Sequence, residues 1–95
     1  MAARWLTEKG LRILDRNVTV GDGELDLIAT DGGHRVVVEV RTVTGPGDPI
    51  DAVDSSKRRH VSALALRLGA TRADLVGVAL RHWGIEVHWV PGGLW

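Results

Sequence analysis

The sequence predicts a single small α/β domain, and three observations support this fold class. The chain has 95 residues, which is enough for one domain over residues 1–95. Hydrophobic residues make up 44% of the chain and charged residues 25%, the balance of an ordinary globular protein. Segments with the 3.6-residue period of a helix alternate with segments that have the two-residue period of a strand.

The expected elements follow from these periods and from the glycine and proline residues between them. In chain order we expect a helix at 2–9, a short strand at 11–14, a turn at 17–23, a strand at 24–29, a hairpin loop at 30–33, a strand at 35–43, a loop at 44–51, a helix at 52–69, and strands at 74–80 and 84–90. The order is therefore helix, three strands, helix, two strands.

The first half of the chain gives the clearest strand signal. Ala2, Trp5 and Leu6 share one face of the first helix, and Gly10 is expected to end it. The strand at 24–29 begins with alternating polar and apolar residues, which is typical of a half-buried strand. The strand at 35–43 is rich in valine on both faces, so we expect it at the centre of the sheet.

The second half is expected to contain the main helix and two further strands. Val53, Val61, Leu64 and Leu68 form one apolar stripe on the helix, and Gly69 is expected to end it. The strand at 74–80 is largely apolar and the strand at 84–90 alternates, so the former should be the more buried.

Several classes of protein are excluded by composition. The chain has no cysteine, which rules out disulfides and thiolate metal sites. No apolar run approaches the roughly 18 residues of a membrane span. The N-terminus lacks the apolar core of a signal peptide, so we expect a cytoplasmic protein without a membrane partner. The formal net charge is zero, but acidic residues gather in residues 18–54 and basic residues predominate on both sides.

The acidic middle of the chain predicts a metal site. Residues two apart in a strand point to the same side, so Glu24 should lie beside Asp26, and Glu39 beside Arg41. The short loop between the two strands makes them antiparallel neighbours, which brings Asp26 near Glu39. Converging carboxylates repel one another, and Mg²⁺ or Mn²⁺ relieves the repulsion. The alternative is a plain acidic edge in which Arg41 forms surface ion pairs.

Four segments of the chain occur in a characteristic order. They are AARWLTEKGLRILDRN, GELDLIATDGG, VVVEVRTVTG and AVDSSKRRHV. In these segments, over residues 2–61, the chain resembles the YraN family of small bacterial proteins, and the resemblance continues more weakly to the C-terminus. That family belongs to the restriction-endonuclease-like PD-(D/E)XK superfamily and is similar to Holliday-junction resolvases. The resemblance implies a restriction-endonuclease-like α-β-β-β-α-β core with an additional C-terminal strand, and a mixed sheet flanked by helices.

The resemblance also implies roles for residues of the central hairpin. Asp26 matches the metal-binding Asp of the family, and Glu39 matches its second acid. Arg41 stands where the family has lysine, and Val40 would offer its main-chain carbonyl to the metal. Glu24 matches the glutamate of the family's GEIDLI pattern. The implied cofactor is Mg²⁺ or Mn²⁺, and the implied partner is nucleic acid, with DNA expected.

Three departures from the family pattern leave the function open, and one of them is Val43 in place of the family's second basic residue. Arginine stays protonated in proteins and cannot accept a proton as lysine can. The glutamate near the start of the family's first helix has no counterpart here, which fits either a truncated N-terminal helix or the absence of this ligand. One prediction is a metal-dependent endonuclease that hydrolyses structured DNA. The other is a weakened or inactive nuclease fold that binds nucleic acid or a protein, and a third is a scaffold with an incidental acidic face.

Two further groups of residues suggest binding surfaces. Lys57, Arg58 and Arg59 are consecutive on the main helix and are predicted to contact phosphates, although a solvated helix face is the alternative. Lys57 also matches a basic or amide residue on the corresponding helix of the family. The second group, near the C-terminus, is Trp83, Trp89 and Trp95, a candidate for a partner-binding patch or a homodimer contact.

Overall fold

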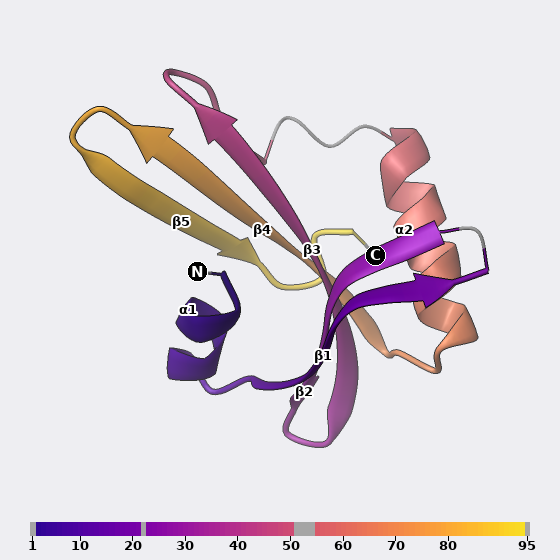
Figure 1. The fold of residues 1–95 in the computed structure, drawn as a ribbon. Helices are drawn as coiled ribbons and strands as arrows, with labels where there is room; N and C mark the ends of the chain where they lie inside the picture. The colour runs from indigo at the N-terminus through magenta and orange to yellow at the C-terminus, as the bar shows by residue number, and fades with distance from the viewer. Residues whose placement is uncertain (1, 22, 51–54, 95) are drawn as a thin grey trace.

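The computed structural model describes residues 2–21, 23–50 and 55–94. Its elements, in chain order, are α1 (Ala2–Glu8), β1 (Arg12–Val20), β2 (Gly23–Asp31), β3 (His34–Thr44), α2 (Ser55–Arg67), β4 (Arg72–Arg81) and β5 (Gly84–Val90). Figure 1 shows the predicted succession of one helix, three strands, one helix and two strands.

The five strands form one mixed sheet in the order β1-β2-β3-β4-β5. β3 and β4 are parallel, because α2 carries the chain back to the starting edge, and the other neighbouring pairs are antiparallel. The valine-rich strand β3 is central, as predicted, and Val36, Val37 and Val38 are fully buried in it. A mixed sheet flanked by helices confirms the predicted α/β class and is consistent with a restriction-endonuclease-like core.

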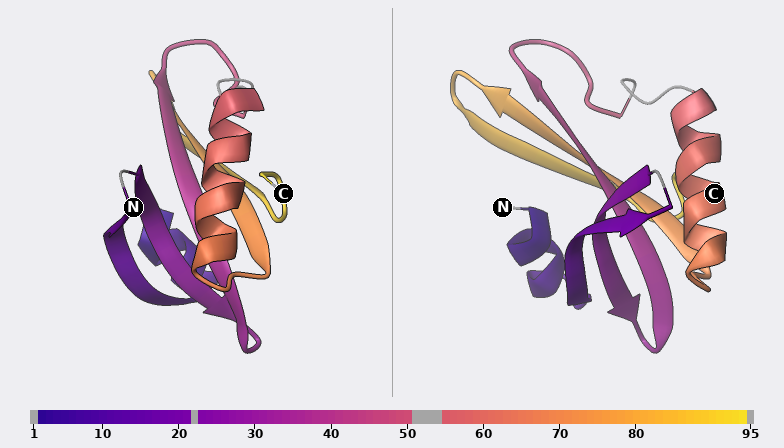
Figure 2. Two further views of the ribbon diagram at one scale, coloured as in Figure 1. Left: turned by 90° about the vertical axis from the view of Figure 1, so that its right-hand side faces the viewer. Right: turned by 45° about the vertical axis from the view of Figure 1, so that its right-hand side comes forward.

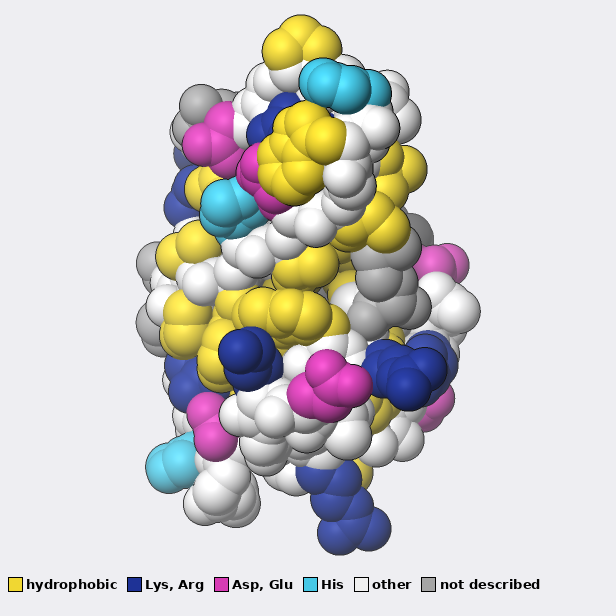
Figure 3. Space-filling model, turned by 90° about the vertical axis from the view of Figure 1, so that its left-hand side faces the viewer, with side chains coloured by type: hydrophobic (Ala, Val, Ile, Leu, Met, Phe, Trp, Pro, Cys, Tyr) yellow, Lys and Arg dark blue, Asp and Glu magenta, His cyan; other side chains and the backbone are white. Residues whose placement is uncertain are grey.

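The two helices cover opposite faces of the sheet (Figure 2). Val37 and Leu75 pack with Leu64 of α2 in one core cluster, whereas Val36 packs with Leu6 of α1 in the other. Helix α1 has seven residues and covers part of its face, and Figure 3 shows hydrophobic side chains exposed on this side of the molecule. The face under α2 is the one that carries the candidate site.

Strand β1 is longer than predicted. We expected a turn over 17–23, but β1 continues to Val20, which pairs with Gly23 of β2. A bulge between Ile13 and Asp15 and a positive φ of 51° at Asn17 accommodate this irregular sequence within the strand. Pairing with β2 therefore overrides the local turn signal.

Helix α2 is described from Ser55, so residues 52–54 of the predicted helix lie outside the described residues. The helix ends at Arg67 rather than at residue 69. Gly69 caps it with a φ of 71°, and the Ala70 N–H donates to the Ala65 carbonyl at 3.0 Å. This is the predicted glycine cap.

Asp74 is a buried carboxylate that joins β4 to the C-terminal turn. Its side chain accepts two hydrogen bonds from Arg72, at 2.8 and 2.9 Å. It also accepts one from Trp89 Nε1 at 2.9 Å and one from the Gly92 N–H at 2.8 Å. Arg72 in turn contacts Asp31 of the β2–β3 hairpin at 2.9 Å. These bonds compensate the desolvation of Asp74, which is 0% exposed.

The described tryptophans have different environments. Trp5 of α1 and Trp89 of β5 pack edge to face, with ring centroids 6.3 Å apart. Trp83 lies between β4 and β5 and is 63% exposed. Trp95 lies outside the described residues, so the predicted patch of three tryptophans stays a prediction. No helix in the described part of the chain is long and apolar enough to cross a membrane.

Candidate metal centre

Asp26 of β2 and Glu39 of β3 meet where the pairing of their strands ends. The β2–β3 ladder runs from the hairpin as far as the pair Leu27 and Val38, one residue short of the two acids. The Val40 N–H donates instead to Asp26 Oδ2 at 2.8 Å, so this side chain bridges to β3 just beyond the ladder. The hairpin geometry thus brings the two predicted acids together.

The carboxyl group of Glu39 is buried and close to that of Asp26. Burial, the negative charge of Asp26 and a hydrogen bond from protonated Glu39 to Asp26 raise the pKa of Glu39 to about 7. When Glu39 is ionised, its Oε2 atom is buried and has no hydrogen-bond partner among the described residues. A buried carboxylate oxygen without a donor is a position that a cation would stabilise.

Lys57 of α2 belongs to this group of side chains. Its Nζ atom lies 3.6 Å from Glu39 Oε1 and opposes the rise in the pKa of Glu39. The sequence placed Lys57 with Arg58 and Arg59 as a phosphate-binding run, but the three side chains diverge. Arg58 donates to the Gly93 carbonyl and Arg59 is exposed. The position of Lys57 on the apolar stripe of α2 was the signal that it faces the sheet.

Arg41 lies on β3 two residues after Glu39, and alternation puts it on the same face. It pairs in register with Gly77 of β4, over which the loop before α2 packs. A Cβ atom at Gly77 would lie 2.7 Å from Pro49 Cγ, so only glycine admits this close approach. The loop therefore packs down on the sheet immediately beside Arg41.

Glu24 lies outside the pair of acids. We expected it beside Asp26 because of regular alternation, but alternation fails at this point of β2. Leu25 packs in the cluster under α2 whereas Leu27, two residues later, packs in the cluster against α1. Glu24 is exposed, and it pairs in register with Thr19 of β1. The structure thus gathers two of the three predicted carboxylates.

The carboxylates of Asp26 and Glu39 fit Mg²⁺ or Mn²⁺ better than a cation that takes all of its ligands from protein side chains. No group of three or more His, Asp or Glu side chains able to hold a metal occurs within residues 2–21, 23–50 and 55–94. Mg²⁺ is commonly bound by one or two carboxylates, with water and substrate phosphates as the remaining ligands. The N–H and C=O of a strand residue face the same neighbour, so the Val40 carbonyl faces the side of Asp26.

We expect the substitution Lys57→Gln to raise the pKa of Glu39 further above its ordinary value, because the positive charge 3.6 Å away is lost. Carbon-detected NMR titration of the Glu39 carboxyl group in chelator measures this pKa. Arg59→Gln, on the exposed side of the same helix, is the matched control and should leave the pKa unchanged. An equal pKa in both variants would contradict the placement of Lys57.

The fold described above, a mixed five-stranded sheet flanked by two helices, is consistent with a restriction-endonuclease-like core, and two acids lie on the sheet face under α2. Residues 1–78 match the uncharacterised protein family UPF0102. The chain belongs to this family, which is the YraN family that the sequence segments indicated.

Curated relatives carry the same family name. A UPF0102 protein of Symbiobacterium thermophilum is 50% identical over 87 residues, covering 81% of this chain and 74% of the relative. A UPF0102 protein of Rhodococcus opacus is 42% identical over 85 residues, covering 87% of this chain and 66% of the relative. One of Leifsonia xyli is 35% identical over 104 residues, covering 97% and 87%. The aligned region thus spans about two thirds of the Rhodococcus protein.

Proposed function

We propose that this chain binds Mg²⁺ or Mn²⁺ through Asp26 and Glu39 and hydrolyses phosphodiester bonds of structured DNA. The observation that carries the proposal is the buried Glu39 Oε2, which has no donor in the described part of the chain and lies in a carboxyl group beside Asp26. Two acids in this position repel each other unless a proton or a cation intervenes.

The residues around the pair have separate roles in this proposal. Asp26, Glu39 and the Val40 carbonyl would hold the cation. When bound, the cation supplies Lewis-acid chemistry, which polarises a phosphoryl oxygen and lowers the pKa of a water molecule. Arg41 and Lys57 would stabilise the negative charge that develops on the phosphate. An arginine side chain at this position cannot replace lysine as a base.

A second candidate function is binding of nucleic acid without cleavage. The observation that favours it is Arg41 at the position of the family lysine, because the wider, planar guanidinium does not replace an ammonium group atom for atom. The two candidates share the metal site and the partner, and they differ in whether the phosphodiester bond is broken.

We expect Asp26→Asn to abolish Mn²⁺ binding, because it removes the charge of one of the two carboxylates that the described residues bring together here. Isothermal calorimetry with Mn²⁺ measures this loss. The matched control is Asp15→Asn, an exposed acid on neighbouring β1, which should titrate like the wild type. Identical heats of Mn²⁺ binding for the wild type and Asp26→Asn would contradict the proposed metal site.

Incubation with branched and linear DNA then separates the two candidates. Cleavage by the wild type in Mg²⁺ that is lost in chelator and in Asp26→Asn supports the enzyme. Mn²⁺ binding without cleavage supports the binding module.

A further inference from the structure

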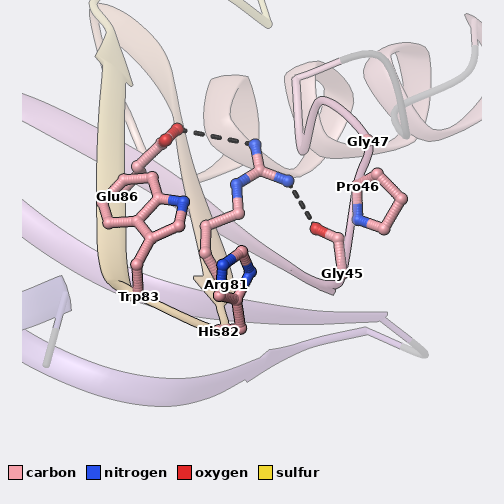
Figure 4. A pocket seen from close by; sticks show the side chains of 7 residues that line it. All are labelled: Gly45, Pro46, Gly47, Arg81, His82, Trp83 and Glu86. Atoms are coloured by element: carbon pink, nitrogen blue, oxygen red, sulfur yellow. Dashed lines mark hydrogen bonds and ion pairs between the residues drawn. The ribbon is translucent and has the colours of Figure 1, made fainter.

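A hollow lies between the loop after β3 and the turn between β4 and β5, away from Asp26 and Glu39. Its volume is about 530 Å³, within the range of about 300–1,000 Å³ that is usual for ligand sites. Figure 4 shows the residues that line it, which are Gly45, Pro46, Gly47, Arg81, His82, Trp83 and Glu86.

Arg81 holds a fixed position in this hollow. One guanidinium N–H donates to the Gly45 carbonyl, and another lies 3.5 Å from Glu86 Oε2. A hydrogen bond with His88, together with Arg81, lowers the pKa of Glu86 and keeps it ionised. Among the described residues these contacts engage two of the five N–H donors of Arg81. The guanidinium is therefore oriented and still has donors for a ligand.

An aromatic ring and a proline ring lie on either side of Arg81. In Figure 4 the Trp83 indole is on one side of the guanidinium and the Pro46 ring is on the other. Trp83 is 63% exposed, and on the opposite wall Pro46 stands between Gly45 and Gly47, which have no side chains. At the upper end of Figure 3, hydrophobic, histidine and charged side chains lie exposed together. The hollow thus presents a stacking surface beside oriented hydrogen-bond donors.

The hollow and the two acids lie on the same face of the sheet. Val43 of β3 is level with Ala79 of β4, which is level with Glu86 of β5. Residues that pair across strands share a face, so Glu86 lies on the face of Val43 and of Glu39. Glu39 precedes Val43 by four residues, which is about 13 Å along the strand. At about 3.4 Å per nucleotide along a duplex strand, this is a separation of about four nucleotides.

We propose that this hollow binds one unstacked nucleobase of single-stranded or branched DNA, with the base against Trp83 and its acceptor atoms toward Arg81. The inference rests on the proposed function, since it assigns the part of the substrate that lies beyond the acids. An oriented arginine recognises base acceptors such as O6 and N7 of guanine. An aromatic platform accepts any base, because every base has a π face. The hollow would favour DNA with an unpaired base a few nucleotides from the bond to be cleaved.

The test is the affinity of a labelled DNA fork with unpaired guanines, measured by fluorescence anisotropy in chelator so that no cleavage occurs. Trp83→Ala should weaken binding about 5- to 150-fold, the range found for loss of one stacked base. Trp83→Phe should retain most of the affinity. Ile85→Ala, a similarly exposed apolar residue on β5, is the control and should bind like the wild type.

The outcomes distinguish this inference from the proposed function. Abasic nucleotides in place of the unpaired guanines should erase the difference between wild type and Trp83→Ala. Unchanged affinity in Trp83→Ala would overturn the base site, whereas Mn²⁺ binding at Asp26 would be unaffected by that result. If Trp83→Ala instead converts a dimer to a monomer in sedimentation and leaves affinity intact, the turn is a contact between copies and the base site is overturned. A wild type that fails to bind Mn²⁺ would contradict the metal site, but it would not change the conclusion drawn from the affinity for the DNA fork.

Discussion

Asp74→Ala is expected to destabilise the fold by about 3–5 kcal/mol, the usual cost of removing one partner from a buried ion pair. The substitution leaves Trp89 Nε1 and the Gly92 N–H without their acceptor, and it deprives Arg72 of its buried partner. A domain of this size is stable by only about 5–15 kcal/mol, so the loss would be a large share of the total. Urea denaturation followed by circular dichroism measures the change.

Asp31→Ala is the matched control for this prediction. Asp31 binds the same Arg72, but its side chain is 38% exposed. Exposed ion pairs are worth about 0–1 kcal/mol, so the control should lie near the wild type. Equal denaturation midpoints for the two variants would show that the buried network around Asp74 contributes no more than a surface pair.

The sequence was sufficient to predict the fold because its strongest signals coincide with the centre of the sheet. The valine-rich strand at 35–43 is buried on both faces in the structure, and glycine caps end both helices where expected. The end of β1 was predicted wrongly, because the turn signal of Gly21-Asp22-Gly23 was extended back to Asn17. Val18, Thr19 and Val20 are β-branched residues that favour a strand, and they pair with β2.

The candidate site was predictable in part for a related reason. Asp26 and Glu39 follow from a tight hairpin and its register, both of which are local. The predicted position of Glu24 required regular alternation through Asp26, but Leu25 and Leu27 pack in clusters on opposite faces of the sheet. The contact of Lys57 with Glu39 depends on how α2 docks on the sheet, which only the packed structure defines. Asp74 was predicted only as a member of a buried strand, because its partners besides Arg72 come from two other parts of the chain, β5 and the C-terminal turn.

Glu39→Gln is expected to stabilise the metal-free protein at pH 8 and to abolish its stabilisation by Mn²⁺. The pKa of Glu39 rises from 4.5 to about 7 on folding, so the folded protein holds this proton more tightly than the unfolded chain. The stability contributed by Glu39 is therefore complete below about pH 4.5, decreases as the pH rises, and is lost above about pH 7. We expect a recovery of about 1–3 kcal/mol from the neutral side chain at pH 8.

Urea denaturation at pH 5 and pH 8, in chelator and then in Mn²⁺, measures both effects. Glu86→Gln is the matched control, because the pKa of Glu86 is lowered rather than raised. At pH 8 that variant should gain no stability, and it should keep the response to Mn²⁺. The wild type should lose stability between pH 5 and pH 8 in chelator and regain it in Mn²⁺.

The sign of the Glu39→Gln result separates a metal centre from an ordinary ion pair. If Glu39 served only as the partner of Lys57, its neutralisation would remove an attraction and destabilise the protein at pH 8. If Glu39 is held beside Asp26 for a cation, neutralisation removes a repulsion and stabilises the metal-free protein. The same substitution must then remove the response to Mn²⁺, because a neutral amide does not replace an anionic ligand. Such a carboxylate lowers the stability of the metal-free protein and raises the stability of the metal-bound protein. A metal ligand accounts for both changes, whereas a purely structural role does not.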